Sequence, residues 1–505
     1  MMSYIDAFID RITMYRLVLY YLVATLGAAF VLGLFHVSRV DPTALAFSTI
    51  VILGACWVAN ELFARVFRVV PNIESVYITG LILALIVDPV TASDMRGVGV
   101  LVFISTWAMG SKFLLAINRK HLFNPAAFAV ALSALAIDAP ATWWVAGDQA
   151  LMPVVIVGGL LLTRKLRRFD LVLSFMAANL AVVVLTSAPA DYLQSLQITL
   201  QHSPFFFFAF VMLTEPLTAP QSRVWRMVYG AMVGILSAPS FAIAGYYLTP
   251  ELALLAGNLL TFAVGPRGRV PMTLDRIEKA ASSAYDFVFR TDRQLAFAAG
   301  QYLEWTLDVA RPDNRGNRRY LTIASAPTEN EVRLGVKFNP AGSAFKRGLA
   351  AMKPGDTIVG AQLAGSFVLP ANRDEKLVFI AGGIGITPFR SMLRYLIDKG
   401  ERRDIVVLYG NARAEDIAYA DVLEEARDEL AIDTIYVVQD AATARPGMEV
   451  GLINAALIQR EVPYFRERTF YISGPQPMVA AMRKTLRHMG VRPTRIKTDF
   501  FPGLA

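Results

Sequence analysis

The chain has 505 residues, of which 55% are hydrophobic and 18% charged, and its net charge is +8. Residues 1–270 contain 30 charged side chains, about 11% of that part, whereas the remaining 235 residues contain 60, about 26%. This division excludes a uniformly soluble enzyme and a pure membrane channel. One cysteine and four histidines, none of them in a paired helical arrangement, indicate no disulfide framework, no thiolate metal site and no bis-histidine haem. The net charge divides evenly between the two parts and indicates no nucleic-acid surface.

The less charged part contains ten apolar segments that could cross a membrane. A spanning helix needs about 20 apolar residues, because lipid offers no partner to bare peptide groups. Several segments are shorter, so we expect some to be broken or re-entrant. We expect no cleaved signal peptide, because no small-residue cleavage site follows the first segment. The segments are 17–35, 44–63, 75–90, 98–117, 125–140, 150–163, 171–188, 204–217, 227–245 and 251–265.

The cations of this part predict its orientation. With ten spans and an inside N-terminus, fourteen cations fall in inside loops and only Arg39 and Arg96 fall outside. This bias predicts a multi-pass protein of the inner (plasma) membrane, surrounded by lipid, with its polar part in the cytoplasm. The fourteen are Arg11, Arg16, Arg65, Arg68, Arg119, Lys120, Arg164, Lys165, Arg167, Arg168, Arg223, Arg226, Arg267 and Arg269.

A short motif occurs twice in the apolar part. The third segment ends in Asp88-Pro89-Val90-Thr91-Ala92, and the eighth ends in Glu215-Pro216-Leu217-Thr218-Ala219. The copies lie five segments apart, which puts them on opposite faces of the membrane and indicates an inverted repeat with a ligand site at its axis. Acidic residues are costly there, so Asp88 and Glu215 are candidate functional residues. The alternative is that acid-Pro-x-Thr only ends a helix twice.

Residues 111–127 (SKFLLAINRKHLFNPAA) and 208–220 (FAFVMLTEPLTAP) carry a resemblance. They resemble the family of membrane subunits shared by the sodium-pumping NADH:quinone reductase and the Rnf complex, over residues 15–266. The resemblance implies a ten-helix inverted repeat that holds flavin and passes electrons through the membrane. It adds Asn124 to the membrane-site candidates, although Asn124 could simply cap a helix before Pro125.

One feature departs from that family. The family attaches FMN covalently to a threonine in a Ser-Gly-Ala-Thr type run, and residues 1–270 contain no such run. We therefore expect no covalent flavin in this chain. A non-covalent FMN in the membrane domain, or a flavin on a partner protein, remains open.

Past Gly265-Pro266 the pattern changes to short alternating segments such as 285–289 and 302–307, separated by turn residues. This is typical of a small antiparallel β-barrel. From about Glu375, four apolar runs alternate with three helical stretches, which predicts a parallel sheet with crossover helices. The runs are 377–381, 405–409, 434–438 and 469–472, and the stretches are 388–399, 415–429 and 477–489. The predicted domains are therefore 1–266, 267–372 and 373–505.

Four motifs occur in order in the charged part. The first apolar run leads into Ala381-Gly382-Gly383-Ile384-Gly385-Ile386-Thr387-Pro388, whose glycines and helix start suit a pyrophosphate. The other three are Gly300-Gln301-Tyr302, Arg319 to Ser325 (RYLTIAS) and Ser473 to Met478 (SGPQPM). Together they resemble the ferredoxin-NADP reductase superfamily over residues 268–505. The resemblance implies an FAD-binding barrel followed by a nicotinamide-nucleotide domain.

The same resemblance implies roles for individual residues. Arg319 would pair with the FAD pyrophosphate, because its fork of donors suits phosphate oxygens. Thr322 would bind the flavin N5 region, and Gly342 and Ser343 would hold the second phosphate side. Tyr320 and Leu321 belong to the same flavin motif. The nucleotide pyrophosphate would lie against Gly382, Gly383, Gly385 and Thr387, and the nicotinamide against Gly474, Pro475 and Met478.

Three residues are candidates at the reacting rings: Thr322, Ser473 and Phe500, which would stack beside the flavin. Thr322 could instead be an ordinary strand residue, and Phe500 an ordinary tail anchor. Two positions depart from the superfamily: Leu321 stands where an aromatic residue often stacks, and Ser473 where many relatives carry cysteine. Asn411-Ala412-Arg413 is followed by two acids and makes a poor 2′-phosphate pocket, so we favour NADH, with NADPH as the alternative.

The sequence therefore predicts a membrane-bound, flavin-dependent NAD(P)H oxidoreductase. Cytoplasmic NADH would reduce FAD by hydride transfer, and electrons would pass into or across the membrane. The acceptor would be a second flavin, a quinone or an extracytoplasmic flavoprotein. One alternative is an NADH:quinone reductase without transmembrane transfer. Another is an inverted-repeat transporter with a redox-sensing reductase domain, whose carriers would be Asp88 and Glu215. A second flavin in the purified protein would favour the first interpretation.

Overall fold

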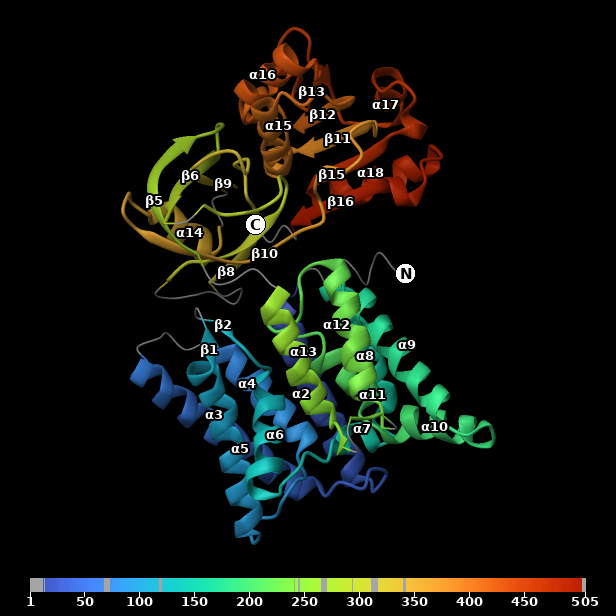
Figure 1. The fold of residues 1–505 in the computed structure, drawn as a ribbon. Helices are drawn as coiled ribbons and strands as arrows, with labels where there is room; N and C mark the ends of the chain where they lie inside the picture. Colours follow the sequence, from blue (N-terminus) through green and yellow to red (C-terminus); the bar gives the residue numbers. More distant parts are fainter. Residues whose placement is uncertain are drawn as a thin grey trace. The chain divides into compact units, whose positions relative to one another are not determined.

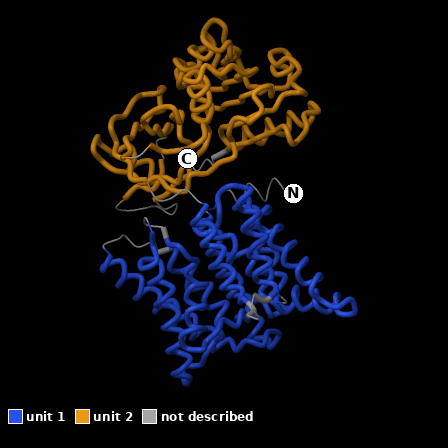
Figure 2. The backbone as a smooth tube through the Cα atoms, in the orientation of Figure 1, with its two compact units in different colours: residues 1–268 blue, residues 269–505 orange. Residues whose placement is uncertain are grey.

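The computed structural model describes residues 12, 14–67, 73–117, 120–239, 241–243, 246–264, 270–292, 294–309, 317–338 and 342–501. The chain divides into two compact units, residues 1–268 and 269–505 (Figure 2). Each unit has hydrophobic core residues of its own. The predicted boundary at Gly265-Pro266 lies outside the described residues.

The first unit is helical, and its helices run alongside one another (Figure 1). Each of the ten apolar segments contains a helix. The polar helix α10 was not predicted, because its residues show no apolar run. The helices are α2 (Met14–Leu34), α3 (Pro42–Phe67), α4 (Ile73–Ile86), α5 (Met95–Leu114), α6 (Pro125–Ile137), α7 (Trp144–Gly147), α8 (Met152–Leu166), α9 (Phe169–Thr186), α10 (Tyr192–His202), α11 (Phe205–Phe207), the π-helical turn η2 (Phe208–Met212), α12 (Arg223–Leu236) and α13 (Pro250–Val264).

Four helices in the described part of the chain, α2, α3, α5 and α9, are long and apolar enough to cross a membrane. The two segments that carry the repeated motif are shorter. Helix α4 ends at Ile86, just before Asp88-Pro89, and η2 ends at Met212, just before Glu215-Pro216. Proline cannot continue a helix, so the acid-Pro pair follows a helix end in both copies. Ten complete spans therefore remain a prediction.

Helices α9 and α12 pack with their backbones in close contact. A Cβ atom on Gly230 would lie 2.5 Å from the Leu171 carbonyl oxygen, and one on Gly234 would lie 2.5 Å from that of Phe175. The Asn179 amide donates to the Gly234 carbonyl at 3.0 Å. Small residues four apart allow such an approach, which strengthens packing where water supplies no hydrophobic driving force.

The second unit begins with a curled antiparallel sheet in the order β8-β7-β10-β5-β6-β9. The two alternating segments singled out in the sequence form β6 and β7, and Phe289 and Trp305 meet inside with ring centroids 5.7 Å apart. The elements are β5 (Val270–Lys279), β6 (Ala284–Thr291), β7 (Tyr302–Thr306), β8 (Arg318–Thr322), β9 (Val332–Lys337), α14 (Ala344–Ala351) and β10 (Thr357–Ala364).

The rest of the unit is a parallel sheet in the order β14-β13-β12-β11-β15-β16. Its four central strands are the four predicted apolar runs. Along β11, Leu377 and Phe379 pack with α15 and α16 on one face, and Val378 and Ile380 pack with α17 and α18 on the other (Figure 1). The elements are β11 (Leu377–Gly382), the turn η3 (Gly383–Ile386), α15 (Thr387–Lys399), β12 (Ile405–Asn411), η4 (Ala414–Asp416), α16 (Ala420–Leu430), β13 (Thr434–Val438), β14 (Glu449–Val450), α17 (Ala455–Glu461), β15 (Thr469–Pro475), α18 (Gln476–His488) and β16 (Ile496–Phe501).

Replacing Gly230 by alanine should destabilise the helical unit. The new methyl group would overlap a backbone carbonyl that cannot move aside, at a cost of about 1–3 kcal/mol. Thermal unfolding of the protein in detergent measures the effect. Gly54→Ala in α3 is the matched control, because no heavy atom lies within 4 Å of its added Cβ. Equal melting temperatures for the two variants would contradict the packing described above.

Candidate functional site

A candidate phosphate-binding corner lies at the edge of the antiparallel sheet. Arg319 comes from β8, and its guanidinium carbon lies 5.3 Å from the ring centroid of Phe345 in α14. Gly342 and Ser343 directly precede α14 and are buried, and the Ser343 side chain caps the helix by accepting from the Lys346 backbone N–H. A fixed guanidinium beside a capped helix N-terminus suits phosphate oxygens. The structure thus brings together the three residues predicted to hold the FAD phosphates.

Thr322 ends β8 and carries a buried hydroxyl. Thr322 is 3% exposed, and its Oγ1 atom has no hydrogen-bond partner among the described residues. The two preceding residues have partners within the protein: the Tyr320 hydroxyl donates to Glu304 at 2.6 Å, and the Leu321 carbonyl accepts from Trp305 at 2.9 Å. A buried polar atom without a partner is costly and calls for an explanation, of which a bound ligand is one. Thr322 therefore fits the predicted contact with a flavin.

The glycine-rich turn that follows β11 forms a second open site. Gly383 has φ +52°, which favours glycine, and no heavy atom lies within 4 Å of the position its Cβ would take. The turn leads directly into α15, and the start of a helix is a favourable place for a phosphate. The Thr387 hydroxyl donates to the Ile384 carbonyl at 3.2 Å and therefore stabilises the turn itself.

The ends of β11 and β15 approach each other at their backbones. A Cβ on Gly385 would lie 2.6 Å from both the Gly474 Cα and the Ser473 carbonyl oxygen. Ser473 is fully buried, and its hydroxyl has no hydrogen-bond partner among the described residues. Met478 lies against Gly382, since a Cβ there would overlap its sulfur. Ligands of open parallel sheets bind at these carboxyl ends, so the predicted nucleotide residues share one site.

The predicted C-terminal contact is only partly described. The backbone of Phe500 lies in β16, where it pairs with Gly474, the residue that follows Ser473. The side chain of Phe500 lies outside the described residues, so its stacking role remains a prediction.

In the helical unit, the two sequence motifs of the first resemblance meet at one carboxylate. Glu215 Oε2 accepts from the Asn124 amide at 2.9 Å and from the Thr218 hydroxyl at 2.8 Å, and His121 Nε2 lies 3.4 Å from Oε1. Asn124 also caps α6, because its side-chain oxygen accepts from the Ala127 N–H at 3.0 Å. The cap interpretation of Asn124 is therefore correct, and the residue has a second contact besides.

The buried amide of Asn258 extends this polar cluster. Its oxygen accepts from the Asn124 backbone N–H at 2.8 Å, and its nitrogen donates to the Thr218 carbonyl at 3.3 Å. Sequence reasoning missed His121, Thr218 and Asn258. A polar residue inside the apolar segment 251–265 was the available signal for Asn258.

Asp88 lies in a different environment. It is exposed, and its Oδ1 accepts from the Thr142 hydroxyl at 2.8 Å. No hydrogen bond or ion pair between described residues joins Asp88 to Glu215. Both Glu215 oxygens have partners within the chain, whereas only Oδ1 of Asp88 has a hydrogen bond between described residues. The roles of Asp88, Asn124 and Glu215 at a membrane flavin site therefore stay predictions.

A further polar network, also missed, joins the antiparallel sheet to the parallel sheet. Tyr419, just before α16, donates its hydroxyl to Asp286 of β6 at 2.5 Å. Burial raises the pKa of the Asp286 carboxyl above its usual value. Burial, together with the neighbouring Asp286, raises the pKa of Tyr419 well above its usual value. The signal for Asp286 was a single acid in an otherwise apolar strand.

Comparison with known proteins finds matches in both units. Residues 145–264 match the NQR2, RnfD, RnfE family, and residues 379–484 match the oxidoreductase NAD-binding domain. Both resemblances are confirmed. The N-terminal half is therefore similar to a membrane-subunit family, and the C-terminal half carries the nucleotide-binding domain of an oxidoreductase.

The curated relatives are flavohemoproteins. That of Candida albicans is 28% identical over 208 residues, covering 40% of this chain and 50% of its own length. That of Pseudomonas putida is 28% identical over 241 residues, covering 47% and 60%. The chain thus spans about half the length of these relatives. Among solved structures, a ferredoxin NADP+ reductase from Neisseria gonorrhoeae with bound FAD and NADP is 20% identical, covering 46% of this chain and 98% of its own, at a TM-score of 0.40.

Replacing Gly385 by alanine should weaken nucleotide binding. The added methyl group would overlap the backbone of Ser473 and Gly474, at a cost of about 1–3 kcal/mol in stability or in NAD+ affinity. Thermal shift with and without NAD+ separates the two effects. Gly410→Ala is the matched control in neighbouring β12, since its Cβ would meet only ordinary contacts of 3.4 Å and longer. Wild-type NAD+ affinity and stability in Gly385→Ala would refute the close approach.

Proposed function

We propose that the protein is a membrane-bound flavoprotein that oxidises NAD(P)H on one side and passes the electrons into or across the membrane. The observation that supports this best is the pair of buried hydroxyls without partners, Thr322 and Ser473, in the two halves of the reductase unit. Thr322 ends β8, which also carries Arg319, and Ser473 lies in β15 beside the glycine-rich turn that follows β11. A flavin on one side and a nicotinamide on the other would supply the missing partners.

The residues that would hold FAD offer a positive charge and the N-terminus of helix α14 to its phosphates. Arg319 would hold the pyrophosphate, with Gly342 and Ser343 on the other phosphate side, and Thr322 would hydrogen-bond near the flavin N5. Bound FAD would supply the ability to take two electrons as hydride from NADH and release them singly. The chain itself positions the two cofactors and excludes water from the buried hydroxyls.

The surroundings of Arg413 support NADH over NADPH. Arg413 is 59% exposed on its side chain, and its guanidinium lies 3.3 Å from Glu415 and 3.7 Å from Asp440. Two carboxylates beside one arginine would repel a 2′-phosphate. The two carboxylates would not repel the ribose of NADH, which carries no 2′-phosphate.

The membrane unit would receive the electrons. Its match to the NQR2, RnfD, RnfE family supports this role. The cation bias supports an inner-membrane location with the reductase unit in the cytoplasm. A single cysteine encodes no iron–sulfur relay, so the acceptor would be a quinone, a non-covalent flavin or an extracytoplasmic flavoprotein. An NADH:quinone reductase without transmembrane transfer is the alternative. A transporter is less favoured, because both Glu215 oxygens already have partners in their own chain, namely Asn124, Thr218 and His121.

Replacing Arg319 by alanine should remove FAD from the protein, because the phosphate corner loses its cation. We expect wild-type protein to release FAD on denaturation, and the variant to contain little flavin and to lose NADH-driven dye reduction. Flavin extraction with mass identification measures both the amount and the number of flavin species. Arg290→Ala, an exposed arginine of the same sheet, is the control. Full FAD content and dye reduction in Arg319→Ala would refute the assignment.

Inverted membrane vesicles test the direction of electron flow. With the reductase unit facing outward, added NADH should reduce a membrane-impermeant acceptor trapped inside. Reduction of a lipid-soluble quinone without reduction of the trapped acceptor would instead establish the NADH:quinone alternative. The Arg319→Ala variant provides the background rate in both assays.

A further inference from the structure

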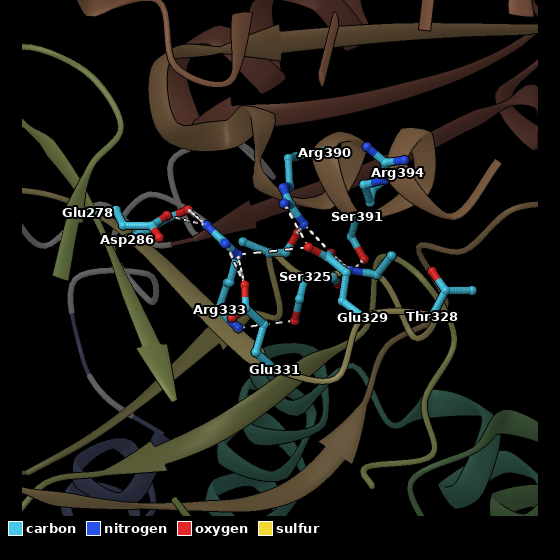
Figure 3. Close-up of polar contacts among 12 residues, drawn as sticks. Glu278, Asp286, Ser325, Thr328, Glu329, Glu331, Arg333, Arg390, Ser391 and Arg394 are labelled. Carbon is cyan, nitrogen blue, oxygen red and sulfur yellow. Dashed lines mark hydrogen bonds and ion pairs between the residues drawn. The ribbon is translucent and has the colours of Figure 1, made fainter. Parts of the chain in front are cut away.

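Helix α15 joins the two halves of the reductase unit one turn after the nucleotide turn. Arg390 donates to Glu329 through both terminal nitrogens, Nη2 to Oε1 at 2.9 Å and Nη1 to Oε2, and Nη1 also donates to the Ala324 carbonyl at 3.2 Å. The Ser391 hydroxyl donates to the Ser325 carbonyl at 2.6 Å. Figure 3 shows Arg390 and Ser391 reaching from α15 to Glu329 and Ser325. We call Arg390, Ser391, Glu329 and Ser325 the α15 clamp.

Most of the clamp is buried, and the Glu329 side chain is 18% exposed. Arg390 is 6% exposed, and Ser391 and Ser325 are fully buried. The segment between β8 and β9 that carries Ser325 and Glu329 is held by hydrogen bonds of its own. Glu329 accepts from the Ala326 N–H at 2.5 Å, and the Ser325 hydroxyl accepts from the Arg333 N–H at 3.0 Å. A largely buried bidentate arginine–carboxylate pair defines both distance and orientation.

The position of the clamp connects the two proposed cofactor sites. The residues it holds on the sheet side, Ala324 and Ser325, follow directly after Thr322 and Ile323. On the other side Arg390 follows Thr387, where the glycine-rich turn becomes α15. The clamp therefore links the end of β8 that carries Thr322 to the start of α15 that follows the glycine-rich turn.

We propose that Arg390 is a positioning residue for hydride transfer, setting through Glu329 the distance between nicotinamide and flavin. This inference rests on the proposed function. In the reaction, the C4–H bond of NADH breaks and the hydride forms a bond to flavin N5, so that NADH is oxidised and FAD reduced. The clamp exchanges no proton or electron. It matters because a misplacement of about 1 Å can slow a reaction by about 100-fold.

Other contacts between the two halves would keep the unit folded without the clamp. Asp416 accepts from Ser282 at 2.5 Å and lies 3.3 Å from the Lys337 ammonium, and Tyr419 donates to Asp286. These contacts lie on other strands and loops. Loss of the Arg390 pair should therefore shift the two halves slightly and leave them joined.

The test uses full-length Arg390→Gln and Glu329→Gln proteins, with Ser391→Ala as a milder variant that removes one hydrogen bond. Arg394→Gln is the matched control: Arg394 lies one turn further along α15 and binds only Asp398 and Glu425 among the contacts of the described residues. FAD content and NAD+ affinity are measured at equilibrium. The long-wavelength charge-transfer absorbance of reduced protein with NAD+ reports ring contact without turnover. Anaerobic stopped-flow mixing with NADH gives the rate of flavin reduction.

We expect Arg390→Gln and Glu329→Gln to keep FAD and NAD+ affinity, to lose charge-transfer absorbance, and to reduce flavin about 10- to 100-fold more slowly. Ser391→Ala should show a smaller effect in the same direction, and Arg394→Gln none. Three outcomes would each overturn the proposal. The first is a wild-type rate of flavin reduction in both Arg390→Gln and Glu329→Gln. The second is an equal loss of this rate in Arg394→Gln, and the third is loss of FAD from Arg390→Gln, Glu329→Gln and Ser391→Ala alike. Failure of NADH and NADPH to reduce the wild-type flavin would instead refute the proposed function.

Discussion

Buried polar groups need partners, and this requirement governs both units. In the helical unit, the chain stops being helical before Glu215, and the carboxylate accepts from Asn124 and Thr218 instead of water. In the reductase unit, Arg390 pairs with Glu329 in a nearly dry contact. Against this background, the partnerless hydroxyls of Thr322 and Ser473 are informative, because the fold could have placed apolar residues there at no cost.

Glycines allow close backbone contacts in both units, but these contacts serve different purposes. In α12, glycines let a neighbouring helix contact the backbone directly, which adds packing where lipid replaces water. In the turn after β11, Gly385 lets the end of β15 contact the turn closely, while Gly383 leaves space open. Gly230 and Gly234 therefore allow two helices to pack tightly, whereas Gly383 leaves space that a ligand can reach.

Periodicity and motifs predicted the elements well, because burial of one strand or helix face is a local property. The apolar runs became β11, β12, β13 and β15, and the apolar segments became helices. Partners far apart in the chain were not predictable. Glu329 and Arg390 are 61 residues apart, and nothing in either segment indicates the other. Asn124 and Glu215 were both singled out as motifs, yet their hydrogen bond required the fold.

The two copies of the acid-Pro motif show how far local chemistry reaches. In both copies the helix ends before the acid, as proline requires. The surroundings then differ, because Asp88 is exposed beside Thr142 whereas Glu215 lies in a polar cluster with four other residues, His121, Asn124, Thr218 and Asn258. Hydrogen bonds from its own chain hold the Glu215 carboxylate in place. The Glu215 cluster therefore joins the two segments that carry the family resemblance, residues 111–127 and 208–220, to Asn258 of α13.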